Sequence, residues 1–165
     1  IEAAITISQG KVPTEVMVQL LQNVRDLLLA PVRLLDGVPE VLHQLAQEHR
    51  LILITKGDLV HQTRKVTTSG LDHLFDHVEI VLEKDVATYS KVFQDISVDP
   101  QRVCMVGNSV KSDILPILEL GGHAVHIPYH FLWELEHAEH PPTSPRFGEL
   151  KNINELPAWI HQLSI

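Results

Sequence analysis

Polar side chains with complementary chemistry stand where three short apolar runs of the chain end, after residues 51–54, 78–82 and 103–107. They are, in chain order, Thr55, Lys56, Lys84, Asn108 and Asp113, and Gly57 adds a backbone N–H beside the first two. A hydroxyl and backbone N–H groups bind phosphoryl oxygens, and a lysine neutralises their charge. A carboxylate and an amide oxygen suit Mg²⁺, which takes few protein ligands and keeps several waters. Together these groups suit a phosphoryl group that is held beside a divalent cation.

The runs that precede these residues are typical of strands buried on both faces of a sheet. We expect strands over residues 51–55, 78–82, 103–107 and 124–129, and a last short strand over 147–150. Helical patterns alternate with the strands from residue 36 onward, which predicts an α/β fold with a parallel sheet flanked by helices. Parallel strands present their carboxyl ends on one side, where ligands of such sheets bind.

Residues 1–32 differ from the rest, because they hold helical patterns and no candidate chemistry. Thr14 is a good N-cap after Pro13, and Pro31 ends the second helix. One apolar stripe runs along that helix and comprises Met17, Leu20, Leu21, Val24, Leu27 and Leu28. We expect this helix to pack on another element through that stripe.

Composition narrows the classes of protein and partner. The chain has 165 residues and a net charge of −8, so it has the size of an ordinary domain and no basic surface for nucleic acid. It has no apolar stretch of membrane-spanning length and no signal peptide. The single cysteine, Cys104, excludes a disulfide framework and favours a buried thiol in the cytoplasm. We expect a cytoplasmic protein with no nucleic-acid or membrane partner. The sequence does not decide between a monomer and a homodimer.

The order and spacing of these motifs resemble the haloacid dehalogenase-like (HAD) hydrolase superfamily over about residues 36–129. Its second motif, a Thr or Ser that ends an apolar strand, matches Thr55, and its third, a Lys before a helix, matches Lys84. Its fourth motif matches residues 105–113, which are followed by Gly121 and Gly122. The resemblance implies a Rossmann-like core over residues 33–165 and makes residues 1–32 the end of a helical cap domain.

The chain departs from the family pattern in two ways. The first motif, Asp-x-Asp, which supplies the nucleophile and the acid/base, is absent. By resemblance it belongs before Ile1, on a strand between those of residues 51–55 and 103–107. We therefore expect an N-terminal segment in the natural protein, and a gap at the centre of the sheet without it. In addition, Asn108 stands where the family has Asp, which leaves Asp113 as the main carboxylate of this motif.

The resemblance implies a phosphohydrolase that acts on a small phosphorylated metabolite through an aspartyl-phosphate intermediate. Thr55 and Lys84 would be catalytic, and Lys56, Gly57 and Asn108 would join them in binding phosphate. Asp113, with Asn108, would hold Mg²⁺. Two alternatives stay open, namely a dehalogenase that attacks carbon without Mg²⁺, and a non-catalytic binding domain.

Each candidate residue also has a structural interpretation. Thr55 is a plausible strand end, Asp113 a plausible N-cap, and Asn108 a residue that holds a turn. Lys91 competes with Lys84, but it falls inside the following helix, so Lys84 is preferred. Histidines crowd residues 123–140 without a cysteine or a three-ligand pattern, which favours surface residues of a loop over a zinc site.

Overall fold

The computed structural model describes residues 2–129 and 143–163. The chain forms two compact units that divide between Arg33 and Leu34. Within the described residues, no helix has the length and apolar character that a bilayer crossing requires. A helical turn is expected near residues 131–136, and this segment lies outside the described residues. The same holds for His130, His137 and His140 of the histidine-rich region.

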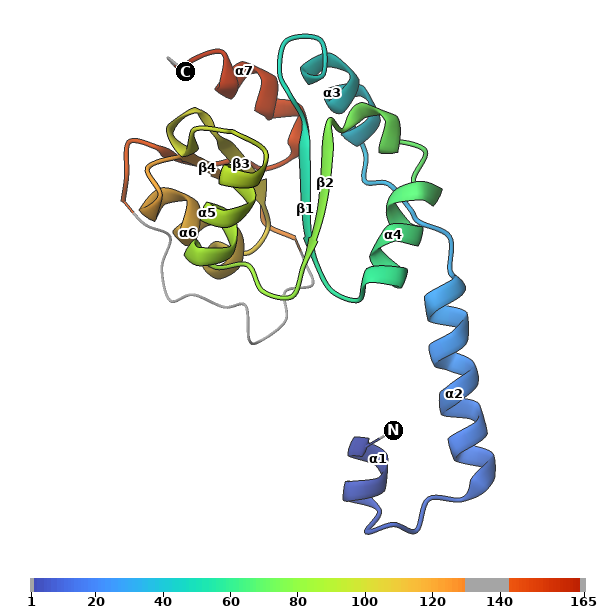
Figure 1. Ribbon diagram of the computed structural model, residues 1–165. Helices are drawn as coiled ribbons and strands as arrows, with labels where there is room; N and C mark the ends of the chain where they lie inside the picture. The colour runs from blue at the N-terminus through green and yellow to red at the C-terminus, as the bar shows by residue number, and fades with distance from the viewer. Residues whose placement is uncertain (1, 130–142, 164–165) are drawn as a thin grey trace. The chain divides into compact units, whose positions relative to one another are not determined.

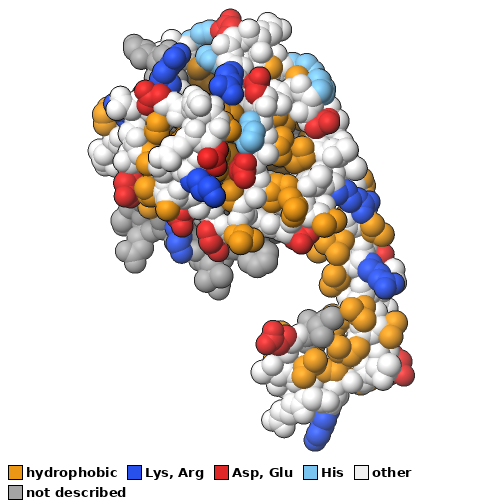
Figure 2. All heavy atoms as spheres, in the orientation of Figure 1, with side chains coloured by type: hydrophobic (Ala, Val, Ile, Leu, Met, Phe, Trp, Pro, Cys, Tyr) orange, Lys and Arg blue, Asp and Glu red, His pale blue; other side chains and the backbone are white. Residues whose placement is uncertain are grey.

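The first unit consists of two helices, α1 (Glu2–Ile7) and α2 (Thr14–Leu29). Helix α2 begins at Thr14, but its N-cap is Pro13 and no side chain caps it, so the predicted Thr14 cap is wrong by one residue. The apolar stripe is present, yet no residue of α2 is buried, and Leu21, Val24 and Leu27 are exposed. The expected packing partner is therefore not found among the described residues, and Figure 2 shows the apolar side chains on the surface of this segment.

Among the described residues of the second unit, five strands form two parallel sheets, and Figure 1 shows β1 and β2 side by side. Strand β1 (Ile52–Lys56) pairs with β2 (His77–Val81) in the first sheet. Strands β3 (Cys104–Gly107), β4 (His123–His126) and β5 (Phe147–Glu149) form the second in that order. Strands β1 and β3 do not pair directly, as the family topology predicts. Pro128 lies beyond the end of β4, where its missing N–H costs no ladder hydrogen bond.

Helices alternate with these strands. They are α3 (Val38–Leu45), α4 (Leu59–Thr68), α5 (Val86–Asp95), α6 (Leu115–Glu119) and α7 (Leu156–Ile160). Short 3₁₀ turns, η1 (Asp72–Leu74), η2 (Pro100–Arg102) and η5 (Ile153–Glu155), join them, and a π-helical turn, η3 (Val110–Ile114), precedes α6. The α/β architecture predicted from the alternating pattern is confirmed.

Successive residues of β4 supply two different cores, because side chains of a strand point alternately to opposite faces. Ala124 packs with α5, η3 and α6, and this core also contains Ile54 of β1 and Val81 of β2. Val125 packs on the other face with α3 and α7. The first core thus holds both sheets together through side chains, with no hydrogen bond between β1 and β3.

Polar caps fix where the helices next to the strand ends begin. Asp58 accepts a hydrogen bond from the N–H of His61 and starts α4. Asp85 starts α5 in the same way, and the hydrogen bonds from Thr88 hold the pKa of Asp85 below its ordinary value. At the C-terminus the residue types predict Asn154 as the cap of the last helix, but this prediction is wrong, because Asn152 accepts the capping bond.

Candidate active site

The carboxyl ends of β1 and β2 lie side by side, because the two strands are parallel and in register. Thr55 lies opposite Ile80 and Lys56 opposite Val81, so Lys84, three residues beyond β2, leaves the sheet on the same side. Asn108 directly follows β3, which belongs to the second sheet. The fold therefore places Thr55, Lys56 and Lys84 at the carboxyl ends of the first sheet and Asn108 at the carboxyl end of the second sheet.

A buried ion pair joins the two groups. Lys84 Nζ donates to Asp113 Oδ1 at 2.8 Å, and the side chains are 15% and 6% exposed, respectively. The second carboxylate oxygen of Asp113 accepts the backbone N–H of Ser109 at 3.1 Å. Because Lys84 follows β2 and Asp113 follows β3, this pair spans the two sheets. A charge-assisted hydrogen bond between side chains of such low solvent exposure fixes both of them more firmly than an exposed ion pair does.

The chain after β3 is shaped to deliver Asp113. Within η3 the N–H of Ile114 bonds to the carbonyl of Ser109 at 3.3 Å, which is the i to i+5 spacing of a π turn. Ser109 caps this turn by accepting the N–H of Ser112, so Ser109, and not Asp113, is the N-cap. The hydroxyl of Tyr89, a fully buried residue of α5, donates to the carbonyl of Ser112 at 3.1 Å.

Gly107 makes room for the carboxylate. A Cβ atom at this position would collide with the side-chain carboxyl group of Asp113. A glycine at the last residue of β3 is thus needed for close approach rather than for a special backbone angle. The glycine at the end of β3 therefore leaves the space that the Asp113 carboxylate occupies.

The other predicted phosphate-binding groups lie at the end of β1. The Thr55 hydroxyl donates to Gln62 Oε1 at 3.3 Å, and the Gly57 N–H donates to the carbonyl of Val81 at 3.2 Å. Lys56 Nζ lies 3.7 Å from Glu83 in a pair whose side chains are 35% and 73% exposed. Lys56 therefore has an exposed acidic neighbour, whereas Lys84 is only 15% exposed and contacts a buried one.

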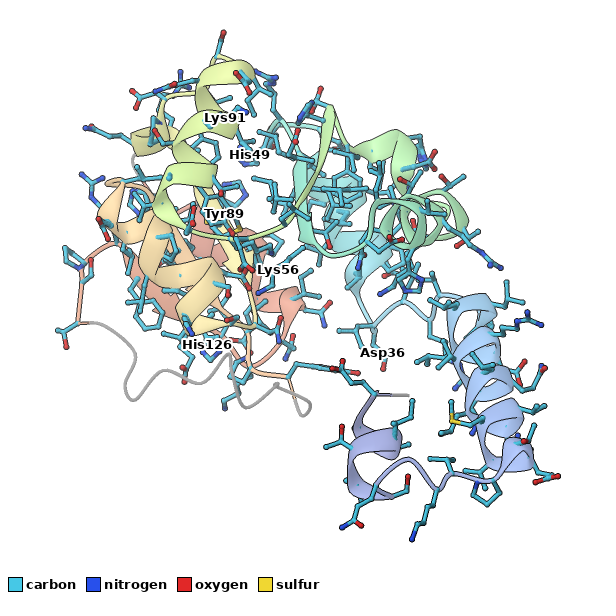
Figure 3. All side chains as sticks on the ribbon, turned by 60° about the horizontal axis from the view of Figure 1, so that its bottom comes forward. Asp36, His49, Lys56, Tyr89, Lys91 and His126 are labelled. Carbon is cyan, nitrogen blue, oxygen red and sulfur yellow. The ribbon has the colours of Figure 1, made fainter. Side chains whose placement is uncertain are left out.

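Lys91, the competitor of Lys84, is exposed on α5 and lies away from Lys56 in the view of Figure 3. The preference for Lys84 thus agrees with its contact to Asp113. Cys104 is a free cysteine, and burial raises the pKa of its thiol to about 12, so it is protonated at neutral pH and no nucleophile.

Two residues near the site were not foreseen as parts of it. Gln62 of α4 contacts Thr55, as described above. His126, the last residue of β4, lies 3.2 Å through Nε2 from the carbonyl oxygen of Asn108 and 3.0 Å through Nδ1 from Glu149 of β5. His126 is the last residue of β4 and Thr55 the last but one of β1, so the same strand-end argument could have found it.

Oxygen donors suitable for Mg²⁺ are present, although they are few. Each carboxylate oxygen of Asp113 accepts one hydrogen bond and keeps a free lone pair, and Asn108 adds an amide oxygen. Across residues 2–129 and 143–163 there is no group of three or more His, Cys, Asp or Glu that could hold a metal ion. The Asp113 carboxylate fits Mg²⁺ as one ligand, since this ion is commonly held by one or two carboxylates and completed by water and phosphate, and Asn108, directly after β3, remains the predicted second ligand.

Comparisons with known proteins agree with this geometry. A family model described as haloacid dehalogenase-like hydrolase matches residues 2–121. The structure of a haloacid dehalogenase-like family hydrolase from Xanthomonas campestris is similar with a TM-score of 0.86 and 32% identity, over 98% of this chain and 68% of that one. Among curated proteins, none matches the sequence.

Two more distant structures show the same fold. A 2-haloacid dehalogenase from Pseudomonas syringae is 20% identical with a TM-score of 0.65, over 94% of this chain and 66% of that one. A predicted phosphoglycolate phosphatase from Haemophilus somnus is 18% identical with a TM-score of 0.68, over 97% of this chain and 73% of that one. The family match and the Xanthomonas likeness, together with the Lys84–Asp113 pair at the strand ends, establish that the chain belongs to the haloacid dehalogenase-like hydrolase family.

Proposed function

We propose that this protein is a phosphohydrolase that acts on a small phosphomonoester. The observation that carries the proposal is the buried pair of Lys84 and Asp113 at the carboxyl ends of β2 and β3. A buried ammonium group is suited to neutralise the charge of a transferring phosphoryl group. The hydroxyl of Thr55, at the end of the neighbouring strand β1, is suited to bind a phosphoryl oxygen.

The proposal includes a covalent step by an aspartate upstream of Ile1. One of its carboxylate oxygens forms a bond to phosphorus, and the bond from phosphorus to the ester oxygen breaks. The leaving oxygen takes a proton from the second acid of the upstream Asp-x-Asp motif. Water then attacks the aspartyl-phosphate and releases inorganic phosphate and the free aspartate. Two easier displacements replace one difficult displacement.

The residues of this chain serve these steps by binding and by orientation. Thr55 and Lys84 hold the phosphoryl oxygens, with Lys56, Gly57 and Asn108 around them. Asp113 and Asn108 are the residues that would hold Mg²⁺, which supplies charge stabilisation when it is bound. Within residues 2–129 and 143–163, β1 and β3 each lack a strand partner on one edge, and both contribute side chains to one core. This arrangement supports an additional strand between them as the carrier of the nucleophile.

The test uses the full-length protein with a generic aryl phosphate and, separately, a 2-haloacid. We expect Mg²⁺-dependent release of the phenol, at a rate that falls at least about 100-fold in Lys84→Ala, as for other electrostatic groups at a reacting centre. The matched control is Lys91→Ala, at the exposed lysine of α5, which leaves the rate unchanged. Halide release without Mg²⁺ would establish a dehalogenase instead. Turnover of neither substrate class would favour a binding domain.

A further inference from the structure

The side chain of Gln62 covers the turn at the end of β1. Its Nε2 donates to the carbonyl oxygen of Lys56 at 3.3 Å, while its Oε1 accepts from the Thr55 hydroxyl at 3.3 Å. An ideal Cβ atom on Gly57 would lie only 2.7 Å from Gln62 Nε2, and the φ angle of Gly57 is +145°. A glycine at this position thus lets the amide of Gln62 lie directly over the backbone.

The two ends of the amide are distinguishable by their partners. The Lys56 carbonyl is an acceptor only, so the NH₂ group of Gln62 must face it. The amide oxygen must then face Thr55, which donates its single hydroxyl hydrogen to it. The one hydrogen that Thr55 can donate is therefore engaged by Gln62 in this arrangement.

We propose that Gln62 is a positioning residue that holds the Thr55 hydroxyl hydrogen in the ligand-free protein and releases it when a phosphate group binds. This inference rests on the proposed function, in which Thr55 binds a phosphoryl oxygen. Phosphoryl oxygens accept hydrogen bonds, so Thr55 has to turn its hydrogen from Gln62 toward them. The bond to Gln62 is long for an O–H donor, whose usual distance is about 2.7 Å. A charge-assisted bond to phosphate is stronger and displaces it.

Release of the hydrogen bond costs part of the binding free energy, and removal of Gln62 recovers that part. Gln62→Met keeps the length of the side chain and removes its acceptor. We expect inorganic phosphate to bind this variant about two- to fivefold more tightly, which is the lower range for one net hydrogen bond. In a Thr55→Val background, where no hydroxyl is left to hold, the same substitution brings no gain. Gln94→Met, at an exposed position of α5, is the matched control.

The experiment combines calorimetric titration of the full-length protein with inorganic phosphate and NMR of the Gln62 side-chain carbonyl carbon. Without phosphate, we expect the chemical shift of the Gln62 side-chain carbonyl carbon to change in Thr55→Val and to stay the same in Thr55→Ser. In the wild type we expect this chemical shift to change as phosphate is added. The Gln94 carbonyl is the reference and stays constant.

The outcomes separate this inference from the proposed function. If Thr55→Val leaves the Gln62 carbonyl unmoved without ligand, Gln62 does not hold the hydroxyl and the inference fails. If the carbonyl responds but phosphate binds Gln62→Met no more tightly than the wild type, the release on binding is wrong. If it responds and the wild type binds no phosphate, the holding role stands while the phosphohydrolase proposal fails.

Discussion

Substitution of Lys84 by Met leaves the carboxylate of Asp113 buried without its charged partner. Removal of one member of a buried ion pair costs about 3–5 kcal/mol of unfolding free energy. The lower end applies here, because Asp113 Oδ2 keeps the N–H of Ser109 at 3.1 Å. We therefore expect a loss of about 3 kcal/mol. In a domain of this size that lowers the melting temperature by about 6–12 °C.

Urea denaturation followed by circular dichroism measures the loss, and a double-mutant cycle isolates the pair. Asp113→Leu in the Lys84→Met background removes the orphaned charge, and we expect it to restore stability to within about 1 kcal/mol of the wild type. Lys56→Met breaks the exposed pair with Glu83 and is expected to cost less than about 1 kcal/mol. A cost for Lys84→Met as small as that for Lys56→Met would refute the reasoning, because the pair would then behave as a surface contact.

Three further predictions concern the elements around this pair. Gly107→Ala is expected to destabilise the protein by about 1–3 kcal/mol in urea denaturation, since its Cβ collides with the Asp113 carboxylate, and a silent substitution would contradict that contact. Tyr89→Phe removes the buried hydrogen bond from the Tyr89 hydroxyl to the carbonyl of Ser112 and should cost about 1 kcal/mol by the same measurement, whereas an unchanged midpoint would mean that this hydroxyl bond contributes nothing. Burial raises the pKa of Cys104 from its ordinary value of 9.0 to about 12, so the folded state binds more protons than the unfolded state in between, and this contribution to stability is complete below pH 9 and lost as pH rises toward 12. Ellman's reagent at pH 8 should accordingly label Cys104 only after unfolding, and rapid labelling of the native protein would show that the thiol is not buried.

The strands and their order were predictable because buried parallel strands have an unmistakable pattern. The apolar runs that end at Thr55 and Gly107 give β1 and β3 within a residue. Helix caps were less predictable, because several polar residues compete near each start. Asn152 and Asn154 are both suitable caps by type, and only the backbone path decides that Asn152 accepts the bond.

The burial of α2 could not be predicted from its sequence. An apolar stripe tells which face of a helix prefers to leave water, but it does not name the surface that covers this face. Leu21 and Val24 lie on the stripe and are exposed in the described structure. The apolar periodicity of a helix is encoded in its own sequence, whereas its burial also depends on the segment that packs against it.

The candidate site shows the same division between local and long-range information. Strand-end logic singled out Lys84 and Asp113 separately, as a charge and as a metal ligand. Their bond at 2.8 Å bridges 29 positions of the chain and follows from no pattern within either motif. Gln62 is close to Thr55 in sequence, but it was not predicted, because a glutamine inside a helix gives no strand-end signal.

The Lys84–Asp113 pair lies between the two sheets, so it contributes both to the stability of the fold and to the arrangement of the candidate site. Strands β1 and β3 share no hydrogen bonds, so within the described residues the two sheets are joined by side chains, in the core around Ile54 and at this ion pair. A bond between the strand ends fixes the separation of the groups that would flank a phosphoryl group, and such preorganisation is the main source of electrostatic catalysis. If Lys84 were only a catalytic group, its removal would cost rate but little stability. Because it also neutralises a buried carboxylate across the gap between the sheets, its removal must cost both.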